Sequence, residues 1–188
     1  MKNLKYIIIL ICIIGISFGG TWYFFKNSRY TFNAETSNGK VSLADFKGEN
    51  VILYFGYTYC ADVCSMTLEV VNKAMENLAS KGVKKEDVLV LFSSLDPERD
   101  TPQALTEYAK FFYPNSVGVK VSLEDLPKVA QNFGIKYEKM GMDNSAMNYS
   151  IAHSSALFLF NKQGELVDIV TNLTEENVEH ALAKFLGI

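Results

Sequence analysis

Residues 51–64, VILYFGYTYCADVC, join an apolar run to a pair of cysteines and decide the fold that we predict. The first six residues are apolar and partly β-branched, which is typical of a strand buried on both faces. This run ends at Gly56, and from about Asp62 to Ala79 apolar side chains recur at helical spacing. The stretch therefore predicts a central strand over residues 51–56, followed by a helix that begins near the two cysteines.

The rest of the chain alternates strands and helices around this unit. Before it, strands 30–34 and 40–41 flank a turn at Asn38-Gly39, and Ser42 caps a single helical turn that ends at Phe46. After it, the patterns predict a strand over 88–93, a helix over 102–112, a strand over 117–121, a helix over 123–133, an extended piece over 135–137, a hairpin over 156–160 and 165–170, and a helix over 175–186. This order predicts an α/β protein with a thioredoxin-like fold.

Composition and charge exclude several classes of protein. The 188 residues are 48% hydrophobic and carry 18 Lys plus Arg against 21 Asp plus Glu, a net charge of −3. Because no excess of basic residues is present, we expect no nucleic acid partner. Three cysteines are too few for a disulfide framework, so we expect a packed hydrophobic core to hold the fold.

The N-terminal segment has the pattern of a membrane anchor. Residues 6–25 are uncharged and lie between Lys5 and Lys26, and twenty residues of helix are long enough to cross a hydrocarbon layer of about 30 Å. An export signal has a similar pattern, but no strong cleavage site follows, so we favour an uncleaved, single transmembrane helix. We therefore predict two parts, residues 1–29 as the anchor with its flanks and residues 30–188 as the thioredoxin-like domain.

Cys60 and Cys64 carry the chemistry of the predicted strand-to-helix junction. Four positions along a helix make about one turn, so both thiols fall on one face, where they can form a disulfide or hold one metal ion. A helix N-terminus also stabilises the thiolate, which is the form that attacks and binds metal. The alternative is that both are buried as small apolar residues.

His153 is the third candidate ligand. It precedes the apolar run 156–160, and in a thioredoxin-like sheet the loop before that strand faces the cysteine loop. Two thiolates and one imidazole form a soft site that favours copper, above all Cu(I), whereas zinc normally takes a fourth ligand. A capping or core role is the alternative for His153, and we expect His180 to be a surface residue in the last helix.

Three motifs in order resemble the Sco/SenC family over residues 30–188. They are Tyr54–Cys64 (YFGYTYCADVC), Ser94–Pro102 (SLDPERDTP) and His153-Ser154. The chain departs from the common family pattern in having Tyr59 where His is frequent, Ala61 and Ser65 where Pro is common, and Ala152 where Asp often precedes the histidine. An aspartate there would fix the tautomer of the histidine, so its loss removes one orienting partner.

The resemblance implies a function and a location. It implies a copper carrier that helps assemble the binuclear copper centre of cytochrome c oxidase, with Cys60, Cys64 and His153 as ligands to Cu(I) or Cu(II). The partner is then the copper-accepting subunit of the oxidase or another copper protein. It also implies a domain tethered outside the bacterial inner membrane or in the mitochondrial intermembrane space. Because the first residues do not resemble an Arg-rich transit peptide, we predict the bacterial inner membrane, with the domain facing the periplasm.

The same residues leave other functions open. A thiol-disulfide reductase would use Cys60 and Cys64 as its redox-active pair to keep the cysteines of a recipient protein reduced, and His153 need not bind anything. A metal-free redox sensor or assembly adaptor fits the same dithiol. The sequence does not rank copper delivery against thiol reduction, and it identifies neither the recipient nor the oligomeric state.

Two further groups of residues have both structural and functional interpretations. In the motif 96–100, Asp100 or Thr101 caps the following helix and Arg99 pairs with a carboxylate, or else Asp96 lies near the cysteine loop and accepts a hydrogen bond from His153. The second group comprises three methionines that precede the histidine. They cover a loop as adaptable apolar side chains, or they offer transient thioether ligands to Cu(I) during transfer: Met140, Met142 and Met147.

Overall fold

A computed structural model of the chain describes residues 29–60, 62–142 and 147–188. The predicted anchor, residues 6–25, lies outside the described residues, and so does Ala61. Within the part of the chain that is described, no helix is long and apolar enough to cross a membrane. Residues 31–188 form one compact unit.

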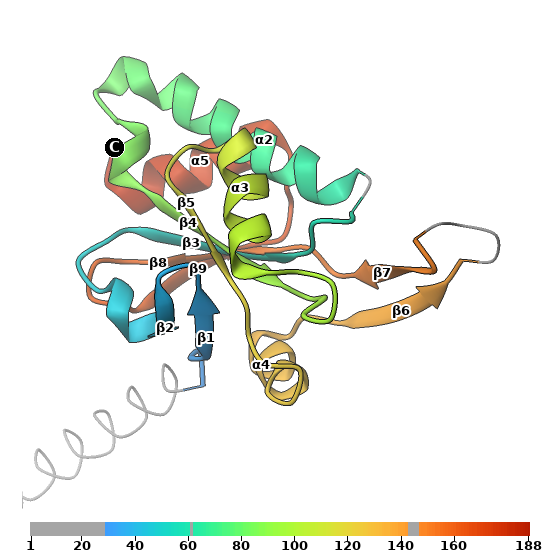
Figure 1. The fold of residues 1–188 in the computed structure, drawn as a ribbon. Coiled ribbons are helices and arrows are strands. Elements are labelled where there is room, and N and C mark those ends of the chain that lie inside the picture. Colours follow the sequence, from blue (N-terminus) through green and yellow to red (C-terminus); the bar gives the residue numbers. More distant parts are fainter. Residues whose placement is uncertain (1–28, 61, 143–146) are drawn as a thin grey trace, which may run out of the picture. The chain divides into compact units, whose positions relative to one another are not determined.

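A five-stranded sheet forms the centre of this unit (Figure 1), in the order β5-β4-β3-β8-β9. Strands β3, β4 and β5 are parallel to one another, whereas β8 and β9 are antiparallel to their neighbours. The strands are β3 (Val51–Gly56), β4 (Leu89–Ser94), β5 (Ser116–Val119), β8 (Leu157–Phe160) and β9 (Leu166–Val170). The predicted buried strand over residues 51–56 is confirmed, and it lies in the middle of the sheet between β4 and β8.

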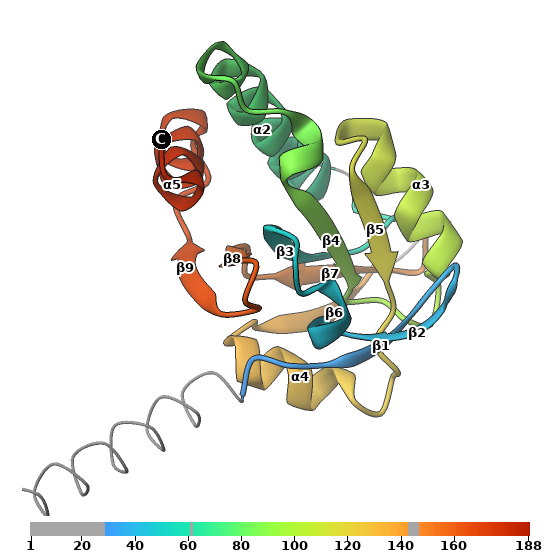
Figure 2. The same ribbon diagram turned by 90° about the vertical axis from the view of Figure 1, so that its left-hand side faces the viewer.

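Helices cover both faces of the sheet. In Figure 2, α2, α3 and α5 lie on one side, and α4 lies on the other side together with the hairpin of β1 and β2. Tyr54 of β3 faces the first side, where its ring stacks on Phe92 at 5.9 Å. Phe55 faces the second side, where its ring lies 5.1 Å from that of Phe133. The helices are α2 (Val63–Leu78), α3 (Pro102–Phe112), α4 (Leu126–Phe133) and α5 (Glu175–Leu186).

The elements that precede the central strand agree with the predicted turn and differ in detail. Strands β1 (Asn33–Thr36) and β2 (Gly39–Ser42) pair antiparallel, and a short 3-10 helix, η1 (Leu43–Phe46), follows. Ser42 does not accept the capping hydrogen bond that we expected. Its backbone N–H and its hydroxyl both donate to Asp45 Oδ2, at 2.6 and 2.9 Å, because the carboxylate is the stronger acceptor.

A two-stranded ribbon, β6 (Tyr137–Gly141) with β7 (Tyr149–His153), is the main difference from the predicted elements. We expected only a short extended piece over 135–137 and a loop up to the histidine. Four of the five residues of β6 are exposed, so the segment lacks the apolar pattern by which a strand is detected. His153 is consequently the last residue of a strand and not part of a loop.

Candidate metal centre

The two cysteines lie where β3 ends and α2 begins. The backbone turns after Gly56, with Cys60 N–H donating to Tyr57 O at 3.3 Å, and α2 starts at Val63. Cys64 is fully buried, whereas Cys60 is partly exposed, and both are free thiols. A Cβ added at Gly56 would lie 2.8 Å from Cys64 Sγ, so the glycine makes room for the buried thiol at the end of the strand.

His153 completes a group of three candidate ligands. Its Nε2 lies 3.6 Å from Cys64 Sγ, and the ligand atoms of Cys60, Cys64 and His153 all lie within 4.8 Å of one another. Among the residues that the structure describes, this is the one cluster of three or more histidine, cysteine or carboxylate side chains close enough to hold a metal ion. The structure thus brings together all three residues singled out from the sequence.

A backbone carbonyl fixes the tautomer of His153. Its Nδ1 lies 3.0 Å from Ser154 O, and because a carbonyl oxygen only accepts, Nδ1 carries the proton. In the neutral ring the lone pair is then on Nε2, and Nε2 is the nitrogen that faces Cys64. The main chain replaces the orienting partner that a carboxylate at position 152 would supply. The imidazole therefore keeps an orienting hydrogen bond although residue 152 is alanine.

The two thiols differ strongly in acidity. The pKa of Cys60 is lowered to about 4. The main cause is a hydrogen bond from the Cys64 thiol, to which His153 adds, and burial acts in the opposite direction. The same hydrogen bond to Cys60 raises the pKa of Cys64, and its burial adds to the rise. At neutral pH the pair therefore holds one thiolate, on the accessible sulfur, and one thiol, on the buried sulfur. A thiophilic metal displaces the remaining proton.

Tyr57, which the sequence analysis did not single out, connects the cysteine loop to the histidine strand. Its buried hydroxyl accepts a hydrogen bond from Ile151 N–H at 3.1 Å. Its ring lies edge-on to that of His153, with centroids 6.1 Å apart. No sequence signal identifies this role, because Tyr57 is one of several aromatic residues in the same stretch.

The carboxylates of the motif that follows β4 are hydrogen-bonded to partners other than the imidazole. Thr101, not Asp100, caps α3, since its hydroxyl accepts from Ala104 N–H at 3.1 Å. Asp100 is buried and accepts from the Thr58 hydroxyl at 2.5 Å and the Ser94 hydroxyl at 2.6 Å, and burial raises its pKa. It thereby holds the start of the cysteine loop. Asp96 accepts from Arg99 and from Tyr149, at 2.5 and 2.7 Å.

His180 lies outside the three-residue cluster, and two of the three methionines have exposed side chains. Met140 is opposite Ser150 in the β6–β7 register, whereas His153 is opposite Tyr137, so Met140 and His153 are on opposite faces of the ribbon. Met140 and Met142 are exposed. His180 lies on α5, as we expected from the sequence.

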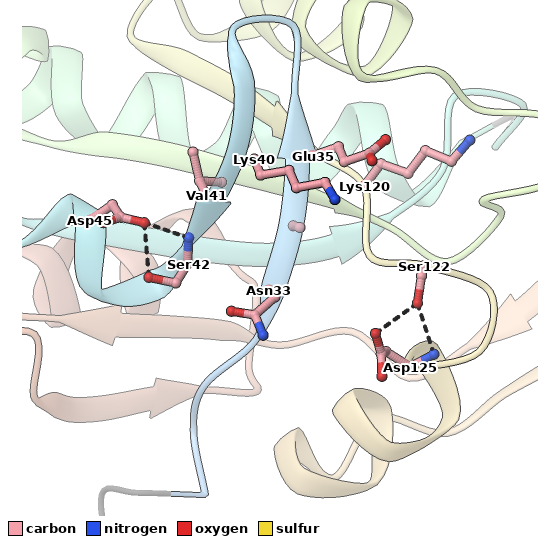
Figure 3. Close-up of a pocket in the computed structure, with 10 residues that line it drawn as sticks. Asn33, Glu35, Lys40, Val41, Ser42, Asp45, Lys120, Ser122 and Asp125 are labelled. Atoms are coloured by element: carbon pink, nitrogen blue, oxygen red, sulfur yellow. Dashed lines mark hydrogen bonds between the residues drawn. The ribbon is translucent and has the colours of Figure 1, made fainter.

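A hollow of about 550 Å³ lies elsewhere, beside the β1–β2 hairpin (Figure 3). Its wall mixes lysines with carboxylates, and two of the carboxylates are already hydrogen-bonded to serines, Asp45 to Ser42 and Asp125 to Ser122. No cysteine or histidine lines it. It therefore lacks the soft donor set of the cysteine and histidine cluster.

Comparison with known proteins places the chain among its relatives. The model of the SCO1/SenC family matches residues 25–187. The chain belongs to the SCO1/SenC family. A SCO2-like protein of Rickettsia prowazekii is 32% identical over 149 residues, which are 79% of this chain and 67% of the relative. The chain spans 64% of two other rickettsial SCO2-like proteins.

Solved structures of this family share the fold. A crystal structure of Arabidopsis thaliana ScoI with copper bound is 30% identical, covers 84% of this chain and 96% of its own, and superposes with a TM-score of 0.74. Solution structures of apo Sco1 from Thermus thermophilus are 35% identical, cover 84% of this chain and 90% of their own, and give a TM-score of 0.69. The family resemblance and the thioredoxin-like α/β fold predicted from the sequence are confirmed.

Proposed function

We propose that this SCO1/SenC protein binds copper through Cys60, Cys64 and His153 and passes it to thiolates of a recipient protein. The observation that carries the proposal is the convergence of two sulfurs and an imidazole nitrogen within 4.8 Å. The copper-bound Arabidopsis relative, at 30% identity, supports copper as the metal. We further propose that the recipient is the copper-accepting subunit of cytochrome c oxidase or another copper protein.

The donor set favours copper over zinc. Thiolate sulfur and imidazole nitrogen are soft or borderline ligands, and Cu(I) accepts two or three of them, whereas structural zinc normally takes four. Within the described residues no fourth cysteine, histidine or carboxylate joins the group. Two thiolates and one imidazole therefore suit Cu(I) best, and the imidazole also provides a ligand for Cu(II).

Transfer begins at the accessible sulfur. Cys64 is fully buried, so a thiolate of the recipient reaches the metal from the side of Cys60, which is partly exposed. The incoming thiolate replaces the Cys60 sulfur on the copper, a second replaces the Cys64 sulfur, and the His153 nitrogen dissociates from the ion. Each released sulfur takes up a proton or remains a thiolate. The exchange changes ligands and not the oxidation state of the metal.

A thiol-disulfide reductase is the second candidate, because the low pKa of Cys60 favours it. The Cys60 thiolate would attack a disulfide of the recipient to form a mixed disulfide and release one recipient thiol. Cys64 would then attack Cys60, which releases the second thiol and leaves a Cys60-Cys64 disulfide. A cellular dithiol must then reduce the protein again. His153 supplies no atom to this sequence of steps.

The N-terminal segment supports a location at the membrane. We propose that residues 6–25 span the bacterial inner membrane once and that the domain 30–188 faces the periplasm, supported by the uncharged twenty-residue segment. A topology reporter fused after Ile188 should read as extracytoplasmic. A cytoplasmic signal from that fusion would refute the location.

Copper transfer from the purified full-length chain tests the main proposal. We expect about one copper per chain and its movement to an acceptor peptide that carries two thiols. The double variant Cys60→Ser/Cys64→Ser should retain no copper after dialysis. Equal copper retention by the wild type and the double variant would refute copper carriage, whereas a wild type that retains no copper but rapidly reduces a disulfide peptide would favour the reductase.

A further inference from the structure

The turn that follows β4, residues 95–100, contacts both segments that carry the candidate ligands. At one end, Asp100 accepts hydrogen bonds from Thr58, at the start of the cysteine loop. At the other end, Asp96 and Arg99 contact the strand that carries His153. Because one short turn touches both segments, it is placed to set the distance between the thiols and the imidazole.

Arg99 makes most of these contacts. Its Nε donates to Asp96 Oδ2 at 2.5 Å, and its Nη1 donates to the backbone carbonyls of Met147 and Tyr149, at 2.9 and 3.0 Å. Asp96 is fully buried, and the Arg99 side chain is 18% exposed. Both carbonyls belong to the segment that enters β7, so the guanidinium holds the beginning of the strand that ends at His153.

The flat faces of Arg99 extend the contact to the cysteine loop. The guanidinium carbon lies 3.7 Å from the ring centroid of Tyr149 and 4.7 Å from that of Tyr59, the residue before Cys60. The Tyr149 hydroxyl also donates to Asp96 Oδ1 at 2.7 Å. One side chain therefore contacts the residue next to a candidate sulfur ligand and the strand that presents the nitrogen ligand.

The ribbon of β6 and β7 needs such a contact because it is not part of the central sheet. Near the histidine, it is held to the cysteine loop by the hydrogen bond from Ile151 N–H to the Tyr57 hydroxyl. We propose that Arg99 is a positioning residue for the copper site, which holds His153 Nε2 in reach of the two sulfurs. This inference rests on the proposed copper binding.

An arginine suits this role better than a lysine. The planar guanidinium forms hydrogen bonds to a carboxylate and to two carbonyls in fixed directions while its faces stack on aromatic rings. A lysine ammonium keeps the charge beside Asp96, but it has neither several N–H donors in fixed directions nor a planar surface that stacks on an aromatic ring. Arg99→Lys should therefore retain part of the folding stability and lose most of the positioning.

A double-mutant cycle on the full-length chain tests whether Arg99 acts through His153. The Cu(I) affinity is measured by competition with a chelator for the wild type, Arg99→Gln, His153→Ala and the double variant. We expect Arg99→Gln to weaken binding by about 10- to 100-fold in the wild type, the usual effect of losing a residue that orients a ligand. In the His153→Ala background it should change the affinity by no more than about twofold.

Two controls separate positioning from general stability. Lys73→Gln removes an exposed ion pair with Glu69 on α2 and should leave copper affinity unchanged. Arg99→Lys should bind copper nearly as weakly as Arg99→Gln, and it replaces that variant if the glutamine protein does not fold. An equal loss of affinity from Arg99→Gln with and without His153 would refute the inference.

A metal-free measurement keeps this inference distinct from the proposed function. In the copper-free protein, the imidazole ¹⁵N shifts of His153 report the hydrogen bond from Nδ1 to Ser154 O. Arg99→Gln should move them towards those of a solvent-exposed histidine, while the shifts of His180 stay constant. Unchanged His153 shifts would overturn the role of Arg99, whereas a wild type that binds no copper would overturn only the proposed function.

Discussion

The cysteine loop and the histidine ribbon supply one site from two different kinds of structure. The cysteine loop extends from β3, whose six residues are all buried between β4 and β8. The histidine ends β7 in a two-stranded ribbon that pairs with no strand of the central sheet and projects to one side of it (Figure 1). The sulfur of Cys64 is therefore positioned by the core, whereas polar contacts of the ribbon help to position the nitrogen of His153.

This difference suits a protein that both holds and releases a metal. Core packing surrounds Cys64, so its sulfur has little freedom to move. The ribbon is held in part by hydrogen bonds that Tyr57 and Asp96 accept and Arg99 donates, and such bonds break at lower cost than core packing. The imidazole is then the ligand that can withdraw while the sulfurs keep the ion.

The largest expected effect concerns the two kinds of ligand. Cys60→Ser and Cys64→Ser should each reduce Cu(I) affinity by more than His153→Ala does, because Cu(I) prefers sulfur to nitrogen. Equilibrium competition with a Cu(I) chelator measures all three. His180→Ala is the matched control and should bind copper like the wild type. If His153→Ala reduced the Cu(I) affinity as much as either serine variant, the ribbon would be as important to binding as the cysteine loop. That result would contradict the difference between the two regions.

A second prediction compares added volume in the two regions. Gly56→Ala places a Cβ 2.6 Å from Phe92 Cε2 and 2.8 Å from Cys64 Sγ, so we expect a loss of about 1–3 kcal/mol in unfolding free energy. At Gly141, in the ribbon, a Cβ meets nothing within 4 Å, and Gly141→Ala should change stability by no more than about 0.5 kcal/mol. Urea unfolding of both variants measures the difference, and equal losses would contradict the contrast.

The difference between the buried core elements and the exposed ribbon explains which parts of the fold the sequence predicted. The apolar run of β3 and the helical pattern after Cys60 identified the core strand, the first helix and the pair of thiols, since burial leaves a regular pattern in sequence. The ribbon was missed because β6 is almost entirely exposed. The contact of Asp100 with Thr58 and that of Arg99 with Tyr149 join residues 42 and 50 positions apart, which no local pattern shows.

A third prediction uses the pH dependence of Cys60 alkylation to compare what Cys64 and His153 contribute to the acidity of Cys60. Since the pKa of Cys60 is lowered to about 4, its thiolate persists from pH 8 down to pH 6, and its alkylation rate should stay nearly constant there, whereas an ordinary thiol slows about tenfold per pH unit. The hydrogen bond from Cys64 lowers this pKa more than His153 does. Peptide mapping after iodoacetamide treatment should therefore show a larger upward shift of the midpoint in Cys64→Ala than in His153→Ala. The reverse order would assign the acidity of Cys60 to the ribbon.

The smallest expected effect concerns the methionines near the tip of the ribbon. Met140 lies on the face of the ribbon opposite His153, and both Met140 and Met142 are exposed, so neither packs in the core. Replacing Met140, Met142 and Met147 with leucine keeps volume and apolarity, and we expect wild-type folding and wild-type copper affinity. We also expect copper to reach an acceptor dithiol at the wild-type rate in stopped-flow measurements. A slower transfer at unchanged affinity would instead establish the thioethers as transient ligands, because thioether sulfur binds Cu(I) more weakly than thiolate and would act only while a cysteine is released. The ribbon would then contribute to release as well as to binding, and its looser attachment would serve movement towards the recipient.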